Sequence, residues 1–241
     1  MIPDTLVTGL AGLYCGPAPD PGAIWTRWNL DPSLLAGLAA LALWLARSRA
    51  GVAAVAVLAV AFVSPLCALS AALFSARVVH HLLLVAMAAP LIALAWPARS
   101  LRAVTPLFLL ATGILWAWHL PVAYDAAMAN VGLYWVMQAS LLGSATAFWR
   151  AVLAPGQPAG QAGLAILGAY MQMGLLGALL TFAPDALYAI HQTAPLAWGF
   201  APLADQQLGG IIMWVPAGLP YAVLGALVAR RGWRRLQARP A

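Results

Sequence analysis

The stretch FSARVVHHLLLVAMAAPLIALAWP, residues 74–97, places an arginine and two adjacent histidines directly before an apolar run that is long enough to enter a lipid bilayer. Charged and metal-capable side chains are costly in hydrocarbon, so they lie at a membrane edge or inside a helix bundle. The other two histidines of the chain, His119 and His191, fall at the same predicted edge. We therefore expect the protein to act at this edge.

The composition is that of an integral membrane protein. Of the 241 residues, 64% are hydrophobic and 7% are charged, whereas an ordinary globular chain is about 25% charged. The basic residues are all arginines and sit in short loops, where membrane topology explains them, so nucleic acid is not expected as a partner. The N-terminus lacks the basic region and apolar core of a cleaved signal peptide.

Seven apolar segments predict an all-α, seven-transmembrane-helix bundle. They lie near residues 33–46, 52–73, 78–96, 104–120, 132–153, 162–183 and 208–229. A proline-rich polar arm, residues 1–32, precedes the membrane domain of residues 33–229, and a basic tail of residues 230–241 follows it. Helix kinks are expected at Pro65, Pro90, Pro216 and Pro220.

The loops predict the orientation. If the segments alternate in direction, ten arginines fall on one side, and by the positive-inside rule that side is cytoplasmic. All six aspartates fall on the other side, and of the arginines only Arg27 and Arg77 join them. The N-terminus is therefore predicted outside and the C-terminus inside. The lipid bilayer is the expected partner of the helices between them.

All four histidines, His80, His81, His119 and His191, are predicted near the outer face. Adjacent helical residues point about 100° apart, so we expect one of His80 and His81 to face the bundle and the other to face lipid headgroups or a neighbouring helix. Met213 lies about one turn into the last helix, and thioether and imidazole ligands together suit Cu(I). Hydrogen-bonded interfacial histidines and a gap-filling methionine are the plain alternatives.

Other polar residues at this edge have structural interpretations. Asp205 is placed as an N-cap or first-turn acid of the last helix, and Gly209–Gly210 would allow close helix approach. Arg77 is expected either to reach lipid headgroups or to turn inward and pair with Asp125 or Asp205. The two cysteines, Cys15 and Cys67, are 52 positions apart and indicate neither a disulfide framework nor a thiolate metal site.

Four segments together resemble the seven-helix CtaG family, assembly factors of caa(3)-type cytochrome c oxidase. They are the opening stretch, WHLPVAYDAAM at 118–128, LTFAPDALYAIHQ at 180–192 and PLADQQLGGIIMWVPAGLPY at 202–221. The resemblance covers roughly residues 28–230. It implies a role in oxidase maturation, a proposed role in copper delivery, and a location in the bacterial plasma (inner) membrane with the histidines toward the periplasm or exterior.

The family pattern carries over only in part. The family typically has H-M-x-Q-H where this chain has Arg77 to His81, so only His81 matches, and the family's second histidine pair corresponds to Tyr134, Met137 and Gln138. The remaining family positions match: His119, Asp125, Asp205, Gln206, Gly210, Met213 and Trp214. This chain therefore resembles a divergent branch that lacks part of the family's histidine set.

Two functions stay open. In the first, the protein handles copper for oxidase assembly, with His81 and His119, and further His80, His191 and Met213, as transient ligands. In the second, it is a metal-free scaffold that binds oxidase subunits or other assembly factors through the outer-edge residues Arg77, Asp125, Asp205, Gln206 and Trp214. The chain has no HExxH pattern and confines its charges to the edges, so a zinc hydrolase or a transporter is not expected.

Overall fold

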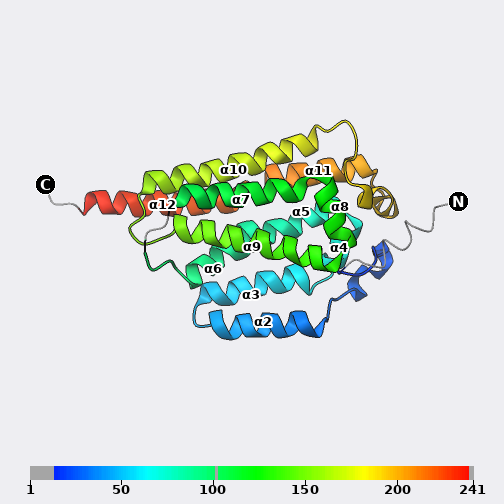
Figure 1. Cartoon of the computed structure of the whole chain (residues 1–241), viewed down its shortest axis with the longest axis horizontal. Coiled ribbons are helices and arrows are strands. Elements are labelled where there is room, and N and C mark those ends of the chain that lie inside the picture. Colours follow the sequence, from blue (N-terminus) through cyan, green and yellow to red (C-terminus); the bar gives the residue numbers. More distant parts are fainter. Residues whose placement is uncertain (1–13, 101–102, 239–241) are drawn as a thin grey trace.

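Apolar helices make up most of the protein, as the composition predicts. The computed structural model describes residues 14–100 and 103–238, and within these ranges it contains helices and no strand. Residues 1–13 of the predicted arm, Arg102, and tail residues 239–241 with Arg239 lie outside the described residues. Figure 1 shows the helices packed side by side along one long axis.

The helices follow one another with short connections. The α-helices are α2 (Pro32–Leu45), α3 (Arg49–Phe62), α4 (Leu66–Ala72), α5 (Phe74–Leu82), α6 (Ala89–Ala95), α7 (Val104–His119), α8 (Pro121–Ala129), α9 (Val131–Val152), α10 (Ala159–Thr181), α11 (Pro202–Trp214) and α12 (Gly218–Gln237). Short 3₁₀ helices are η1 (Pro21–Thr26), η3 (Ala189–His191) and η4 (Ala194–Trp198), and η2 (Leu83–Ala88) is a π-helical turn.

Three helical stretches are long and apolar enough to cross a membrane: Phe74–Ala95, Ala159–Thr181 and Pro202–Gln237. Two more qualify if each bent pair is one span, α3 with α4 at 44° and α7 with α8 at 75°. Helix α2 is apolar but shorter. The structure thus confirms an all-helical protein with candidate membrane spans, numbering three to five by length and composition.

Prolines lie at or beside the breaks where kinks were predicted, except Pro220, which lies in the first turn of α12. Pro65 lies at the bend between α3 and α4, and Pro216 lies between α11 and α12. Pro90 lies in the first turn of α6, directly after the π-helical turn η2. Proline lacks a backbone N–H and crowds the preceding turn, so a helix that contains it bends or changes its hydrogen-bond pattern there.

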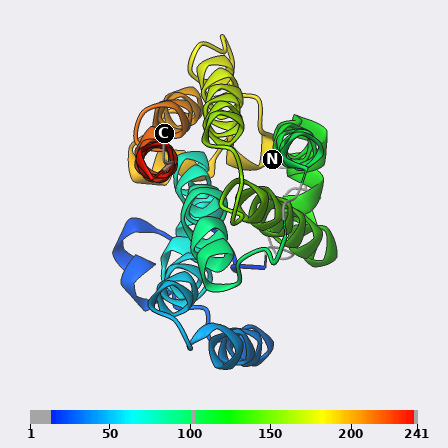
Figure 2. The same cartoon turned by 90° about the vertical axis from the view of Figure 1, so that its left-hand side faces the viewer.

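Helix α5 lies inside the bundle, where it packs chiefly against α11 and α4. In the end-on view of Figure 2, α2 lies at the periphery and the segment containing α5 lies near the middle. Small residues allow the close approach of α11, as predicted. A Cβ on Gly209 would lie 2.7 Å from the Phe74 ring, and a Cβ on Gly210 would lie 2.5 Å from the Gly177 carbonyl oxygen.

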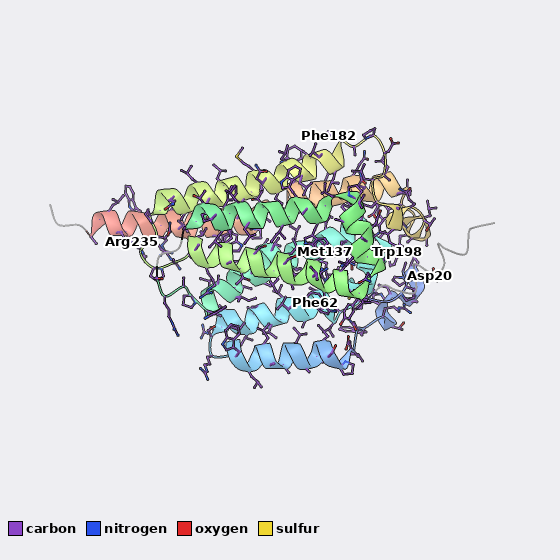
Figure 3. The ribbon with its side chains drawn as sticks, viewed as in Figure 1. Asp20, Phe62, Met137, Phe182, Trp198 and Arg235 are labelled. Atoms are coloured by element: carbon purple, nitrogen blue, oxygen red, sulfur yellow. A yellow bond between two sulfur atoms is a disulfide. The ribbon has the colours of Figure 1, made fainter. Side chains whose placement is uncertain are left out.

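The two ends of the bundle differ in charge. Figure 3 places Asp20 at the end that carries the N-terminal arm and Arg235 at the opposite end. Helix α12 carries Arg230, Arg231, Arg234 and Arg235 toward its C-terminus. These residues lie at opposite ends of the bundle, as the loop charges predict for them.

Candidate functional site

Helix α5 brings Arg77, His80 and His81 together at spacings of three and four residues, so they share one side of the helix. Their side chains are 1%, 0% and 2% exposed, respectively. The expectation that one histidine would face lipid headgroups is therefore wrong. Because α5 is surrounded by other helices, side chains pointing about 100° apart can both be buried.

Three histidines on two helices form a row, which a phenylalanine of a third helix extends. Phe62 of α3 contacts His80 edge-on, with ring centroids 4.8 Å apart. The His80 and His81 centroids are 5.8 Å apart, and the His81 and His119 centroids are 6.1 Å apart. The row thus runs from α3 through α5 to the end of α7. Three of the predicted ligands are neighbours.

The hydrogen bond of His119 determines which of its nitrogens can bind a ligand. Its Nδ1 lies 2.7 Å from the Leu115 carbonyl oxygen, which only accepts, so Nδ1 carries the proton. The Nε2 atom is then left with the lone pair. A backbone bond that orients the ring in this way is typical of metal-binding histidines.

His80 and His81 retain unused nitrogens. Both ring nitrogens of His80 and Nε2 of His81 are buried and make no hydrogen bond. Buried polar atoms are normally paired, because desolvation without a partner costs about 1–3 kcal/mol each. These atoms therefore mark a place where a ligand, an ion or ordered water completes the structure.

Arg77 turns inward, but it forms neither of the predicted ion pairs. Its guanidinium lies over the Tyr134 ring, 5.3 Å from the centroid. The Tyr124 and Tyr134 hydroxyls are close by, yet none of its three side-chain nitrogens makes a hydrogen bond of good geometry. Both expectations, the headgroup contact and the pairing with Asp125 or Asp205, are wrong.

Asp205 binds the start of α5 instead. It lies in the first turn of its own helix, as predicted, but its carboxylate accepts hydrogen bonds from the backbone N–H of Phe74, at 2.6 Å, and of Ser75, at 3.2 Å. The Ser75 hydroxyl donates to it as well. Asp205 is therefore the cap that holds the N-terminus of α5 against α11.

Gln206, the next residue, holds the connection that leads into α11. Its side-chain oxygen accepts from the Leu187 backbone N–H at 2.7 Å, and its nitrogen donates to the carbonyl oxygens of Leu180 and Asp185. The pair Asp205–Gln206 thus fixes both α5 and the α10–α11 connection. This explains why a glutamine is buried near the end of an apolar helix.

Asp125 and His191 make hydrogen bonds that are separate from the histidine row. The Asp125 carboxylate accepts from the backbone N–H groups of Ala189 and Ile190. His191 Nδ1 donates to the Ala72 carbonyl, and its Nε2 accepts from the Tyr124 hydroxyl at 2.8 Å. Burial first, and then the Arg77 charge, lower the pKa of His191 to about 3, so the ring stays neutral. Both of its nitrogens are already engaged.

Met213 and Trp214 are not brought to the histidine row by any contact in the described residues. Met213 is buried and lies against Gly177 of α10. Trp214 is 43% exposed, and its backbone carbonyl accepts from the Tyr170 hydroxyl. Both residues serve helix packing in this structure.

The structure contains a disulfide that was not predicted from the sequence. Cys15 and Cys67 are bonded, with Cα atoms 5.3 Å apart, so the interpretation that the cysteines indicate no disulfide is wrong. The bond ties the arm to α4 beside the site. Tyr14 stacks on Tyr134 at 5.1 Å, and the Cys15 sulfur lies 3.5 Å from the Tyr134 hydroxyl. The arm therefore covers the tyrosine that lies over Arg77.

Tyr124 and Tyr134 are the other residues that sequence reasoning left without a role. Tyr124 lies beside Asp125 in the segment after the WHLP turn, and Tyr134 lies near the start of α9. Gln138, four residues after Tyr134, is also buried with an unpartnered amide, and it lines a groove of about 440 Å³ together with Phe62. The helical spacing of Tyr134 and Gln138 was the signal available for placing them on one inward face.

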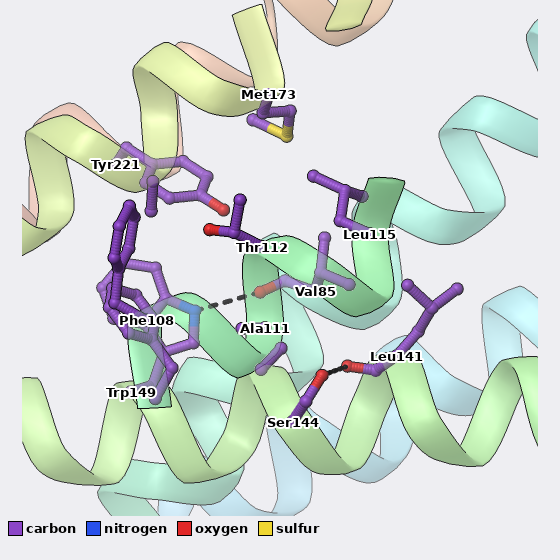
Figure 4. A pocket seen from close by; sticks show the side chains of 13 residues that line it. Val85, Phe108, Ala111, Thr112, Leu115, Leu141, Ser144, Trp149, Met173 and Tyr221 are labelled. Carbon is purple, nitrogen blue, oxygen red and sulfur yellow. Dashed lines mark hydrogen bonds between the residues drawn. The ribbon is translucent and has the colours of Figure 1, made fainter. Parts of the chain in front are cut away.

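A small cavity lies in the interior beyond the histidine row. Its volume is about 40 Å³, and it is lined by Leu115, Met173 and Tyr221 among others (Figure 4). At its wall the Trp149 indole donates to the Val85 carbonyl in η2, at 3.0 Å. Ligand pockets measure about 300–1,000 Å³, whereas this volume suits a few water molecules. The histidine row, rather than this cavity, is the candidate site.

The site and the fold define a class: a helical membrane protein with a buried cluster of histidines and one arginine near the end that carries the arm. Within residues 14–100 and 103–238, no three His, Cys, Asp or Glu side chains are grouped closely enough to hold a metal ion.

The chain belongs to the cytochrome c oxidase caa3 assembly factor family, CtaG, whose model matches residues 42–108 and 105–235. No curated protein and no solved structure matches the chain. Membership confirms the resemblance and implies oxidase-related partners and a membrane environment. An assembly-factor family also favours a non-catalytic role.

Proposed function

We propose that this protein assists copper delivery to, or metal-centre maturation of, a cytochrome c oxidase at the outer face of the bacterial plasma (inner) membrane. The observation that carries the proposal is the His81–His119 pair. Two imidazoles that bind one ion through bonds of about 2 Å have centroids about 6 Å apart, and these rings are 6.1 Å apart. His81 Nε2 is unpartnered, and His119 Nε2 carries the lone pair.

The donor set suits Cu(I), a soft ion that accepts few ligands. His80 lies on the other side of His81, and within the described residues it is not grouped with the His81–His119 pair closely enough to be a third ligand unless the side chains shift. His191 and Met213 would join only after rearrangement, because His191 uses both nitrogens and Met213 packs against α10. A site of low coordination fits transfer, since a carrier must release its ion.

Replacing both His81 and His119 by alanine should lower the affinity for Cu(I) at least tenfold, about 1.4 kcal/mol. The measurement is competition between the purified, reduced protein and a chromophoric Cu(I) chelator. Met171→Leu is the matched control, because this methionine is exposed on α10 and should leave the affinity unchanged. Equal Cu(I) affinity of the wild type and the double variant would refute the copper site.

The second candidate is a metal-free scaffold for oxidase subunits or other assembly factors. Two points favour it: the described residues hold no group of three His, Cys, Asp or Glu ligands, and the resemblance to the family implies a histidine where this chain has Arg77. Capture of apo-oxidase subunits that is equally strong with and without a copper chelator supports the scaffold. Copper rescue of a deletion phenotype supports delivery.

The proposal includes seven membrane spans with the N-terminus outside. The segregated loop charges support this topology, and so does the Cys15–Cys67 disulfide near the aspartate-bearing arm, because disulfides persist in oxidising compartments. Alkaline phosphatase, which folds only outside, should be active when fused after Asn130 and inactive when fused after Gly156. The reverse activities, or equal ones, would contradict the orientation.

A further inference from the structure

Arg77 is a buried positive charge without a counterion. Its side chain is 1% exposed, and no carboxylate among the described residues lies within ion-pairing distance of it. Taking an ion out of water costs several kcal/mol unless an opposite charge compensates it. An arginine cannot escape this cost by losing its proton. A compensating negative charge is therefore required by the protein interior itself.

The two carboxylates that the sequence offers as partners of Arg77 are occupied. Asp205 accepts three hydrogen bonds at the start of α5, and Asp125 holds the backbone before His191. The tyrosine ring under Arg77 supplies only part of the compensation, because a cation–π contact is weaker than the pairing of two full charges. The charge of Arg77 is thus left for a group that the chain does not contain.

The neighbours of Arg77 offer donors to an anion. His80 and His81, three and four residues on, have unpartnered ring nitrogens, and a neutral imidazole carries one N–H. The guanidinium adds three nitrogens with free N–H groups. Within the described residues this cluster therefore combines a full positive charge with several unfilled donors. That is the chemistry of an anion site, where charge-assisted hydrogen bonds are the strong ones.

We propose that Arg77, with His80 and His81, binds a small monovalent anion, which is either a free halide such as chloride or a carboxylate supplied by a partner. The bound anion neutralises the guanidinium and accepts the unfilled N–H bonds. The site shares two histidines with the proposed copper site but does not depend on it. When copper occupies Nε2 of His81, only Arg77 and His80 have N–H groups left to donate to the anion.

The test measures thermal unfolding of purified, copper-free protein with a chelator present. Chloride replaces gluconate at constant ionic strength, and a parallel series uses acetate. Overnight dialysis precedes each measurement, because Tyr134 and the arm cover Arg77 and slow any entry. The wild-type unfolding temperature should rise saturably by about 5 °C, and Arg77→Gln should abolish the rise.

Two further variants make the result specific. Arg77→Lys keeps the positive charge but lacks the planar guanidinium with its several N–H donors. Its unfolding temperature should therefore still rise, but half of the rise should require a higher anion concentration. Arg230→Gln removes an exposed arginine of α12 and should behave as the wild type. A rise with chloride assigns a free halide, and a rise with acetate alone assigns a carboxylate.

The proposal is overturned if neither anion stabilises the wild type more than gluconate does, or if Arg77→Gln shows the same rise as the wild type. Bromide soaked into crystals of the wild type supplies an answer that needs no variant. Anomalous density beside Arg77 supports the site, whereas bromide at surface arginines alone overturns the assignment of a free halide. Because copper is absent throughout, failure of the copper proposal leaves these outcomes unchanged.

Discussion

Replacing Cys15 and Cys67 together by serine is expected to destabilise the protein by about 4 kcal/mol, because the disulfide closes a loop across a sequence separation of 52 residues. The arm would be released from α4 and from the stack between Tyr14 and Tyr134. For a chain of this size the unfolding temperature should fall by about 10 °C. Thermal unfolding in detergent, with and without reductant, measures the effect.

The controls distinguish the effect of the disulfide bond from the effect of the cysteine side chains. Each single serine variant should lose as much as the double variant, since either one removes the bond. Reductant should lower the unfolding temperature of the wild type and leave the double variant unchanged. If the reduced wild type unfolds at the same temperature as the oxidised protein, the bond does not contribute to stability as expected.

Asp205→Ala is expected to cost about 3 kcal/mol, the second largest effect. The substitution leaves the backbone N–H groups of Phe74 and Ser75 and the Ser75 hydroxyl without their acceptor inside the bundle. An unsatisfied buried donor costs about 1–3 kcal/mol, and loss of a cap costs about 1 kcal/mol. Thermal unfolding of the purified variant should show a decrease of about 9 °C.

Asp205→Asn should lose less, because the amide keeps one oxygen to accept from α5. Asp185→Asn is the matched control: this aspartate is exposed in the α10–α11 connection, so its neutralisation should leave stability unchanged. If Asp205→Ala and Asp185→Asn unfold at the same temperature, the capping role of Asp205 is wrong.

Most of the fold could be predicted from local patterns. Apolar runs near 33–46, 104–120, 132–153 and 162–183 correspond closely to α2, α7, α9 and α10. A long apolar run buries its backbone hydrogen bonds within itself, so its position depends little on partners. The helix breaks at Pro65 and Pro216 were predictable for the same reason, because proline acts on its own helix.

The last helix was less predictable. Its expected start at 208 falls inside α11, which begins at Pro202. The polar residues Asp205 and Gln206 resemble a loop end in the sequence. In the structure their side chains are paired with α5 and with the α10–α11 connection, so the helix can include them without desolvation cost. Only the partner elements reveal this.

By itself the sequence determined the all-helical membrane class, the positions of most apolar helices, the charge difference between the two ends and the family. Each of these depends on composition, on hydrophobic runs or on local motifs. The tertiary structure decided which polar groups meet: the burial of both His80 and His81, the His81–His119 pair, the cap that Asp205 provides, the Cys15–Cys67 bond and the absence of a carboxylate partner for Arg77 within the described residues. These contacts join segments far apart in the chain, so their geometry depends on helix packing that no local pattern encodes.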